Sequence, residues 1–129
     1  MPLDVVAELP TTWVTASVEA PLPGYVCVVS KKHVVEPFDL TPDDQTAFWS
    51  ETMLVARAVA TLLRPSRINY EIHGNTVAHL HVHLLSRYDG DPFEGEPIDF
   101  RRASFARSKA QLADIAASIE APSAARASR

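Results

Sequence analysis

Glycine is scarce in this sequence. Only four of its 129 residues are glycines, namely Gly24, Gly74, Gly90 and Gly95. The loops that hold phosphate in the Rossmann and P-loop folds need patterns such as G-x-G-x-x-G or G-x-x-x-x-G-K-[ST]. No arrangement of these four positions fits either pattern, so we exclude both classes of nucleotide-binding enzyme.

Cysteine, long apolar runs and N-terminal basic residues are also rare or missing. Cys27 is the only cysteine, which excludes a disulfide framework and a cysteine-rich zinc site within the chain. No apolar run approaches the roughly 18 residues of a membrane helix. Residues 1–10 contain two acids and no lysine or arginine, so they lack the basic start of a signal peptide. We therefore expect a cytoplasmic protein without membrane association.

The charge and length of the chain limit its partners and its organisation. The formal net charge is −4, whereas a protein that coats nucleic-acid polymers needs a basic surface. We therefore expect no nucleic-acid partner. A chain of 129 residues is expected to form a single domain over residues 1–129, with a disordered tail from about 121 to 129.

The periodicity of hydrophobic residues predicts four strands and two helices. The predicted strands are Thr12–Val18, Tyr25–Ser30, Arg67–His73 and His79–Leu85. Thr41 and Pro42 are typical of a helix start, and the apolar spacing that follows predicts a helix ending at Pro65. A second helix is predicted from about Phe105 to Ile119, after a polar loop over Tyr88–Pro97.

The order of these elements favours an α+β fold. Two strands precede the first helix and two follow it, without strict β-α-β alternation, so we expect an antiparallel sheet. The last two strands are separated by the five residues 74–78, which suits an antiparallel hairpin.

Three histidines alternate with apolar residues in the last predicted strand. His79, His81 and His83 share one face, and Leu80, Val82 and Leu84 share the other. Each imidazole has two polar nitrogens that need partners, so three of them on one face are costly in a core. The strand is therefore predicted to pack on its apolar face and to perform chemistry on its histidine face.

Two kinds of chemistry fit this histidine face. Alternate histidines on a strand can bind zinc, although Glu71 is the only acid in the two hairpin strands and can simply face solvent. Alternatively, an imidazole can attack phosphorus and form a covalent phosphoramidate while its neighbours hold the phosphate oxygens. Histidine suits this second role because its ordinary pKa lies near neutrality.

The histidine segment has a specific pattern and characteristic surroundings. His79–Leu85 fits H-φ-H-φ-H-φ-φ, where every φ position is apolar, and Gly74–Ala78 precedes it with the sequence GNTVA. The other matching segments are Pro23-Gly24, Lys31-Lys32-His33 and Leu40-Thr41-Pro42. From about Ala16 to Arg87, the chain therefore resembles the histidine-triad superfamily of nucleotide hydrolases and transferases.

The resemblance implies a reaction and a set of residues that perform it. Members act at the α-phosphate of a nucleoside phosphate ester, anhydride or phosphoramidate. Here His81 would be the nucleophile that becomes nucleotidylated, and His79 and His83 would orient it and bind phosphate oxygens. The remaining implied contacts are Thr76 on the leaving-group side, Asn75 and Asn69 at the phosphate, and Ser17 at the position of the ribose contact.

The resemblance also implies a fold, an assembly and a substrate class. The family fold is α+β, with a five-stranded antiparallel sheet and two helices, so a fifth strand is expected near the N-terminus. A homodimer with a sheet continuous across the interface is expected, together with a purine nucleoside phosphate as substrate. The nucleophilic chemistry would need neither a metal ion nor another cofactor.

Three positions depart from the family's pattern. Tyr25 stands where a further histidine is common, and Ser17 stands where many members have an acid that binds the ribose hydroxyls. Ser86 and Arg87 replace a common Pro-Arg pair. The departures at Tyr25 and Ser17 leave open a non-catalytic nucleotide-binding or regulatory module on the same fold. A zinc site built on the triad is a second alternative to a hydrolase.

The other candidate residues receive a structural interpretation. His33 is expected at a strand end away from the triad, and His73 is expected in a solvent-facing turn. Cys27 lies in an apolar strand and is interpreted as a small buried hydrophobic residue rather than a nucleophile. Trp13 is interpreted as a packing residue.

Overall fold

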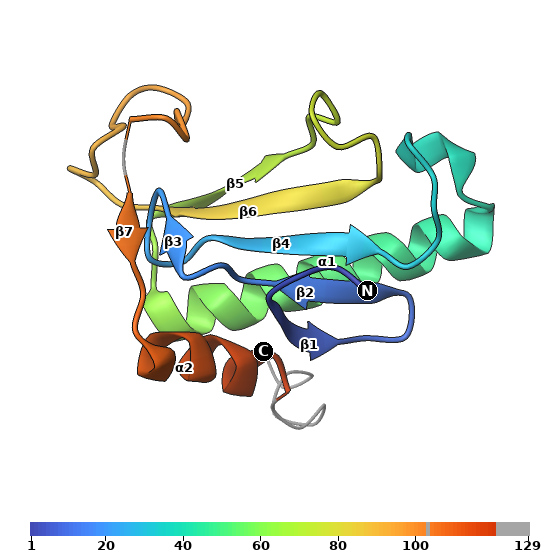
Figure 1. The fold of residues 1–129 in the computed structure, drawn as a ribbon, viewed down its shortest axis with the longest axis horizontal. Coiled ribbons are helices and arrows are strands. Elements are labelled where there is room, and N and C mark those ends of the chain that lie inside the picture. The colour runs from blue at the N-terminus through green and yellow to red at the C-terminus, as the bar shows by residue number, and fades with distance from the viewer. Residues whose placement is uncertain (103, 121–129) are drawn as a thin grey trace.

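Five antiparallel strands form the main sheet of the computed structural model, which describes residues 1–102 and 104–120 (Figure 1). The strands lie in the order β1-β2-β4-β6-β5. Their bounds are Val5–Glu8 (β1), Thr12–Thr15 (β2), Val26–Ser30 (β4), Arg67–Glu71 (β5) and His81–Arg87 (β6). The antiparallel sheet and the fifth strand near the N-terminus are therefore confirmed. The predicted disordered tail lies outside the described residues.

Two α-helices, a short 3-10 helix and a small second sheet complete the described part of the chain. Their bounds are Pro37–Asp39 (η1), Pro42–Leu63 (α1), Lys109–Ile119 (α2), Glu19–Ala20 (β3) and Phe105–Ala106 (β7). In Figure 1, α1 runs behind the sheet, and α2 lies below the C-terminal turns of α1. No helix among the described residues is long and apolar enough to span a membrane.

One face of the sheet packs on the helices. Val14 of β2, Val28 of β4 and Val82 of β6 are fully buried and form one cluster with Phe48 of α1 and Ile115 of α2. Burial of each such side chain stabilises the fold by about 1.5–3 kcal/mol. Because side chains alternate along a strand, the intervening residues point to the opposite face, away from the helices. The histidines of β6 lie on that opposite face.

Local capping groups set the first helix, as predicted. The Thr41 side chain accepts a hydrogen bond from the Asp44 backbone N–H at 3.2 Å, and Pro42 occupies the first helical position. Arg64 ends the helix with a left-handed backbone conformation, φ 51°, immediately before Pro65. All of these groups are adjacent in the sequence, so no tertiary information was needed to place the helix.

The second helix begins later than predicted. Its N-cap is Ser108, whose Oγ accepts from the Gln111 N–H at 3.1 Å while Gln111 Oε1 accepts from the Ser108 N–H at 2.8 Å. Phe105–Ala106, which the periodicity assigned to the helix, instead pairs with Glu19–Ala20 as β7. The predicted start at Phe105 was therefore wrong, because the capping box and a distant strand partner outweigh the apolar spacing.

The histidine strand is also shifted relative to its prediction. It begins at His81 rather than His79 and extends to Arg87. Leu80 departs from the ladder because its N–H donates to the Val34 carbonyl at 2.8 Å and its carbonyl accepts from the Ser30 N–H at 3.0 Å. His79 therefore lies just before β6, on the segment that enters the strand. The other strands end at or within their predicted ranges.

Gly24 is required where the chain passes closest to β6 and α1. A Cβ atom at this position would lie 2.6 Å from Ser86 Oγ and 2.8 Å from Leu63 Cδ1. Both distances are too short for real side chains, so residue 24 must lack a Cβ atom if the start of β4 is to pack this tightly.

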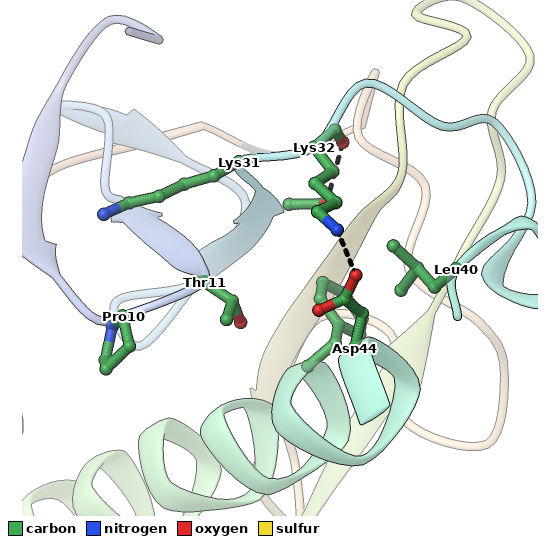
Figure 2. Close-up of a pocket in the computed structure, with 8 residues that line it drawn as sticks. Pro10, Thr11, Lys31, Lys32, Leu40 and Asp44 are labelled. Atoms are coloured by element: carbon green, nitrogen blue, oxygen red, sulfur yellow. Dashed lines mark hydrogen bonds and ion pairs between the residues drawn. The ribbon is translucent and has the colours of Figure 1, made fainter. Parts of the chain in front are cut away.

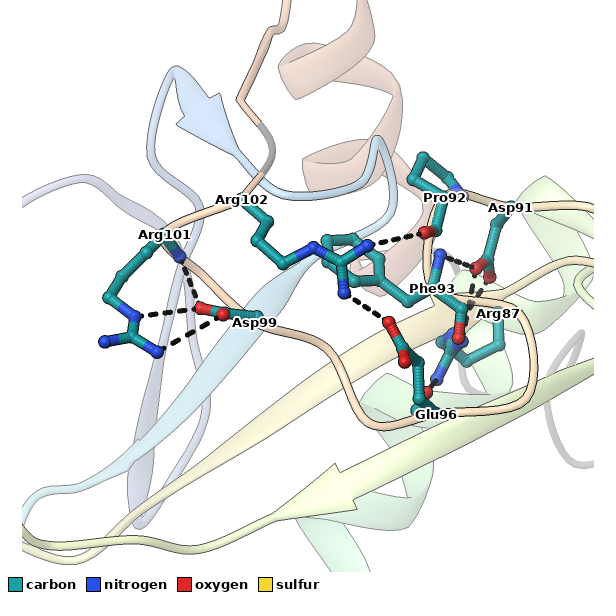
Figure 3. A network of polar contacts seen from close by, with 8 residues as sticks. All are labelled: Arg87, Asp91, Pro92, Phe93, Glu96, Asp99, Arg101 and Arg102. Carbon is teal, nitrogen blue, oxygen red and sulfur yellow. Dashed lines mark hydrogen bonds and ion pairs between the residues drawn. The ribbon is translucent and has the colours of Figure 1, made fainter.

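Arg87 organises the loop that follows β6 (Figure 3). Its side chain is buried and donates to Asp91 at 2.9 Å and 3.1 Å, to the Phe93 carbonyl at 2.7 Å and to the Glu96 carbonyl at 3.0 Å. Phe93 is itself fully buried in a second apolar cluster with Leu85. The segment predicted as a polar loop therefore has its own small core and a buried ion pair.

Candidate active site

The sheet register brings the histidines of β6 beside the central strand β4. His81 is the cross-strand partner of Val29, and His83 is the partner of Cys27. His79, His81 and His83 lie on the face of the sheet away from the helices, because they alternate with the buried Leu80 and Val82. The predicted grouping of the three histidines is thus present in the structure.

One ring nitrogen of His81 is hydrogen-bonded, and the other has no hydrogen-bond partner among the described residues. Its Nδ1 lies 2.6 Å from the His79 carbonyl oxygen, which can only accept a hydrogen bond. Nδ1 therefore carries the proton, and Nε2 of the neutral imidazole carries the lone pair. The His83 ring contacts His81 edge-on with 4.8 Å between centroids, which further limits rotation of the ring. His81 is thus held in the tautomer that a nucleophile needs.

His79 is held in place by two hydrogen bonds, one of which comes from His33. His79 Nε2 donates to the Ser30 carbonyl at 2.6 Å, so Nδ1 of neutral His79 is an acceptor. His33 Nδ1 lies 2.8 Å from that atom and donates to it. The prediction that His33 lies away from the triad was therefore wrong. The segment after β4 continues beside the residues that precede β6, where the Leu80 N–H donates to the Val34 carbonyl, and this places His33 next to His79.

His83 is a neutral imidazole over a wide pH range. Burial lowers its pKa most, the nearby His81 and His73 lower it as well, and Glu71 opposes the shift, so that the pKa lies at about 4. Its Nδ1 is 2.8 Å from the Tyr25 hydroxyl. A neutral His83 carries one ring proton, and the direction of its hydrogen bond with Tyr25 determines which ring nitrogen carries that proton.

Tyr25, a departure from the family pattern, directly contacts the triad. Burial raises the pKa of the Tyr25 phenol, so it keeps its proton and donates to His83 Nδ1. His83 therefore carries its proton on Nε2. The two rings also stack with 5.8 Å between centroids, and Phe100 packs edge-on against Tyr25 at 5.5 Å. The buried Arg107, directly after β7, donates to the Tyr25 carbonyl at 2.6 Å and so holds this residue beside the end of that strand.

Cys27 lies on β4, the strand next to β6, and is the cross-strand partner of His83. It is buried, as predicted, and burial raises the pKa of its thiol to about 12. The group is therefore a neutral thiol near pH 7, which does not suit a nucleophile. Its Sγ is 4.0 Å from His83 Nδ1, and donor atoms of Cys27, His81 and His83 all lie within 4.8 Å of one another. These three residues could therefore hold a metal ion.

His73 lies closer to the triad than its predicted turn position indicated. Its side chain is half exposed, in agreement with the prediction, but its ring centroid is 5.6 Å from that of His83. His73 Nε2 is also 2.8 Å from Glu71 Oε1, and the Glu71 side chain is only 17% exposed. Glu71 therefore faces His73 and the triad rather than open solvent.

Among the described residues, the side chains of the remaining predicted site residues form no hydrogen bond with one another or with the three histidines of the triad. Asn75 and Thr76 are exposed on the segment between β5 and β6. Asn69 Oδ1 accepts from Arg87 at 2.8 Å, which leaves its amide N–H groups for other partners. Ser17 Oγ donates to the Glu19 carbonyl at 2.7 Å. The substrate contacts assigned to these four residues stay predictions.

An apolar hollow of about 460 Å³ adjoins the triad. Trp13, Val29 and Val77 line it together with His79 and His81. A smaller hollow of about 140 Å³ lies near the start of α1, where the Lys32–Asp44 ion pair spans it (Figure 2). The smaller hollow has no histidine in its lining. A further hollow of about 650 Å³ along β5 is lined by His73 but by no histidine of the triad, so the hollow beside His79 and His81 is the candidate binding site.

The chain is similar to known proteins in both sequence and fold. A family model described as HIT domain matches residues 1–90. The chain is 28% identical over 95 residues to the bifunctional bis(5'-adenosyl)-triphosphatase/adenylylsulfatase FHIT of Arabidopsis thaliana, which covers 70% of this chain and 53% of that protein. It is 31% identical over 80 residues to the asymmetrical bis(5'-nucleosyl)-tetraphosphatase of Schizosaccharomyces pombe, with 58% and 44% covered. The chain thus spans about half the length of these curated relatives.

A solved structure confirms the fold. The histidine triad protein of Bradyrhizobium japonicum superimposes with a TM-score of 0.81 at 24% identity, over 90% of this chain and 87% of that chain. Both the five-stranded antiparallel sheet and the two helices expected from the sequence are thereby confirmed. Since the family model covers well over half of the 129 residues, including all three histidines of the triad, this chain belongs to the HIT domain family.

Proposed function

We propose that this protein is a nucleotide hydrolase that cleaves nucleoside phosphoanhydrides at the α-phosphorus through a covalent nucleotidyl-His81 intermediate. The observation that carries the proposal is the hydrogen bond from His81 Nδ1 to the His79 carbonyl. This bond fixes the lone pair on Nε2, on the face of the sheet away from the helices. An imidazole prepared in this way is a competent nucleophile near neutral pH.

The first step transfers the nucleotidyl group to the enzyme. The Nε2 lone pair attacks the α-phosphorus, an N–P bond forms, and the P–O bond to the leaving phosphate breaks. The leaving phosphate takes the bonding electron pair and departs as an anion, which takes up any proton from solvent. The positive charge that develops on the His81 ring is stabilised through the Nδ1–H bond to the His79 carbonyl, which strengthens as the donor becomes charged.

The second step returns the enzyme to its starting state. Water attacks the same phosphorus, the N–P bond breaks, and its electron pair returns to Nε2. The products are a nucleoside monophosphate and free His81. Splitting the displacement into two steps lets the same phosphate-binding groups stabilise both transition states.

The neighbours of His81 supply hydrogen-bond donors for the phosphate oxygens. The Tyr25 hydroxyl donates to Nδ1 of His83, so the ring proton of His83 lies on Nε2. This Nε2–H would donate to a phosphate oxygen, whose negative charge grows during the displacement. Asn75 and Thr76 lie on the exposed segment that leads into His79, within the same stretch of chain. We assign Thr76 to the leaving-group side, and we assign Asn75 and Asn69 to the α-phosphate.

We further propose dinucleoside polyphosphates with purine bases as the substrate class. The curated relatives named above are a bis(5'-adenosyl)-triphosphatase and a bis(5'-nucleosyl)-tetraphosphatase. The hollow beside His79 and His81 offers the Trp13 indole and the apolar Val29 and Val77 side chains as a surface for a nucleoside. Ser17 would contact the ribose of the nucleotide.

A homodimer and a cytoplasmic setting complete the proposal. β5 is an edge strand of the main sheet, so its outer hydrogen-bonding groups can pair with a second copy. Tyr70 and Ile72 are 51% and 42% exposed along this edge. Such an edge supports a sheet that continues across a two-fold interface. A single buried thiol suits a reducing compartment.

The proposal is tested by assaying the full chain after treatment with EDTA. Nucleoside monophosphate release is measured from diadenosine tetraphosphate and from adenosine phosphoramidate, with wild-type protein and His81→Ala. We expect turnover of diadenosine tetraphosphate that survives chelation and falls by at least about a thousandfold in His81→Ala, because the nucleophile is lost. His73→Ala serves as a control that removes a nearby imidazole outside the proposed chemistry.

Two outcomes would contradict the proposal. Binding of the nucleotide without turnover would make the protein a nucleotide-binding module instead. Loss of activity on chelation with recovery on adding zinc would contradict the metal-free mechanism.

A further inference from the structure

A sulfur atom and two imidazole nitrogens converge beside the proposed nucleophile. Cys27 Sγ and one ring nitrogen from each of His81 and His83 lie within 4.8 Å of one another. Cys27 is the direct cross-strand partner of His83, and His81 lies two residues before His83 on the same face of β6. The backbones of two central strands therefore place all three donors in one shared space.

Each of the three side chains can present a lone pair to this space. His81 Nδ1 is hydrogen-bonded to the His79 carbonyl, which leaves Nε2 available. His83 Nδ1 is the nitrogen on the cysteine side, 4.0 Å from Cys27 Sγ, and it accepts a hydrogen bond from the Tyr25 hydroxyl at 2.8 Å. An ion bound there would take the place of that hydroxyl proton. The Cys27 thiol would release its proton to solvent as the sulfur–metal bond forms.

The donor set selects a particular class of metal ion. One thiolate and two imidazoles suit Zn²⁺ and Co²⁺, whereas Mg²⁺ and Ca²⁺ prefer carboxylate and other oxygen ligands. Bond lengths of about 2.3 Å to sulfur and 2.0–2.1 Å to nitrogen place tetrahedral donors roughly 3.3–3.6 Å apart. In the structure, the three donor atoms lie within 4.8 Å of one another. Rotation of the side chains, with the strands fixed, would bring them to the shorter distance. Three protein ligands also leave a fourth position for water.

We propose that Cys27, His81 and His83 form a binding site for a thiophilic divalent ion such as Zn²⁺, and that occupation of this site inhibits the enzyme. Inhibition rests on the proposed function, because the ion would occupy the Nε2 lone pair with which His81 attacks phosphorus. Binding of the ion does not depend on that function. The site would make nucleotide hydrolysis responsive to the concentration of free zinc.

Cobalt binding tests the site without any nucleotide. Chelator-treated full-length protein is titrated with Co²⁺ and followed by absorption. Because Cys27 is the only cysteine, a thiolate-to-cobalt charge-transfer band reports this residue alone. We expect the band to saturate at one Co²⁺ per chain and to be displaced by Zn²⁺.

Variants of the histidines decide whether the band comes from the proposed site. His81→Ala and His83→Ala should each weaken Co²⁺ binding on the order of tenfold or more, since even outer-shell changes cost that much. His73→Ala should bind as wild type does, although its ring centroid is only 5.6 Å from that of His83. Absence of the band in wild type, or unchanged binding in both histidine variants, would overturn the site.

A separate assay tests inhibition. Hydrolysis is measured over a range of free Zn²⁺ for wild type and for Cys27→Ser, which preserves the size of the side chain. We expect Zn²⁺ to inhibit wild type, and we expect Cys27→Ser to need at least about tenfold more Zn²⁺ for the same inhibition. Cobalt binding with zinc-insensitive hydrolysis would overturn inhibition alone. Cobalt binding with no hydrolysis in chelator would overturn the proposed function and leave the metal site standing.

Discussion

The chemistry of each histidine in the triad is set by the partner of its other nitrogen. His81 Nδ1 donates to a backbone carbonyl, which directs its lone pair to Nε2. His83 Nδ1 accepts from Tyr25, which directs its proton to Nε2. Two side chains of the same type, two residues apart on one strand, are thus prepared for opposite roles. In the proposed mechanism, His81 is the nucleophile and His83 is a hydrogen-bond donor to the phosphate.

Tyr25→Phe tests the role assigned to the tyrosine hydroxyl. The variant keeps the ring that stacks on His83 but removes the hydrogen bond to Nδ1. We expect kcat to fall roughly tenfold, which corresponds to about 1.4 kcal/mol for a lost hydrogen bond that orders a catalytic group. Steady-state kinetics measures the change. Tyr88→Phe is the matched control, since it also loses one hydroxyl bond, to the Leu63 carbonyl at 2.8 Å, away from the triad. An equal fall of kcat in both variants would argue against a role for Tyr25 in the site.

The sequence identified the triad but not all of its partners. The alternation of His79, His81 and His83 with apolar residues is local, so it could be seen without a structure. The contacts of His33 with His79 and of Tyr25 with His83 span 46 and 58 residues, respectively. They depend on the register of β4 against β6 and on the path of the chain after β4. Periodicity carries no information on either, which is why His33 was wrongly placed away from the site.

Among the helices and strands, some ends are set by neighbouring residues in the sequence and others by residues far away in the chain. The first helix was predicted because Thr41, Pro42 and Pro65 mark its ends in the sequence itself. The start of the second helix was missed because Phe105–Ala106 pairs with Glu19–Ala20, more than 80 residues earlier in the chain. A two-residue strand has no periodicity of its own, so only the tertiary structure could reveal it.

The loop after β6 owes its conformation to one buried ion pair, and this makes it sensitive to acid. Arg87 lowers the pKa of Asp91 to about 2, from an ordinary value of 3.8. The unfolded chain therefore binds more protons than the folded chain between these two values. The ion pair stabilises the fold fully above about pH 4, and its contribution is lost as the pH falls through 2.

Asp91→Asn tests this contribution. At pH 7 we expect the free energy of unfolding to fall by about 1–3 kcal/mol, because an uncharged acceptor replaces a carboxylate beside a buried guanidinium. The variant should also lose less stability than wild type between pH 4 and pH 2. Chemical denaturation across this pH range measures both effects. Asp99→Asn is the matched control, because the Asp99–Arg101 pair lies at the surface and should contribute little (Figure 3). Identical acid profiles for wild type and Asp91→Asn would contradict the account.

In the molecule as a whole, one face of the main sheet packs on the helices and the other carries the candidate active site. One face carries the fully buried Val14, Val28 and Val82 against the helices, and the other presents His81 and His83. In the proposed mechanism, side-chain donors fixed by the strands hold the phosphate, so the site needs no glycine-rich loop. The scarcity of glycine excluded one way of binding nucleotides and left this one available.

Tyr70→Lys tests the proposed dimer. A charged side chain at the centre of the exposed β5 edge should prevent pairing with a second copy. Light scattering after size-exclusion chromatography should show a dimer for wild type and a monomer for the variant. Phe38→Lys is the control, since Phe38 is 75% exposed on η1, outside the main sheet. A monomeric wild type, or a variant that stays dimeric, would contradict an interface along β5.

The central claim is that His81 carries the nucleotidyl group during turnover, and trapping that intermediate tests it most directly. Full-length protein is mixed with excess diadenosine tetraphosphate for a fraction of a turnover and quenched with alkaline denaturant, because phosphoramidate bonds break in acid. Intact-mass and peptide mass spectrometry then locate the adduct. We predict one adenylyl group on His81, and none in His81→Ala. An adduct on another residue, or rapid turnover with no adduct under these conditions, would contradict the mechanism.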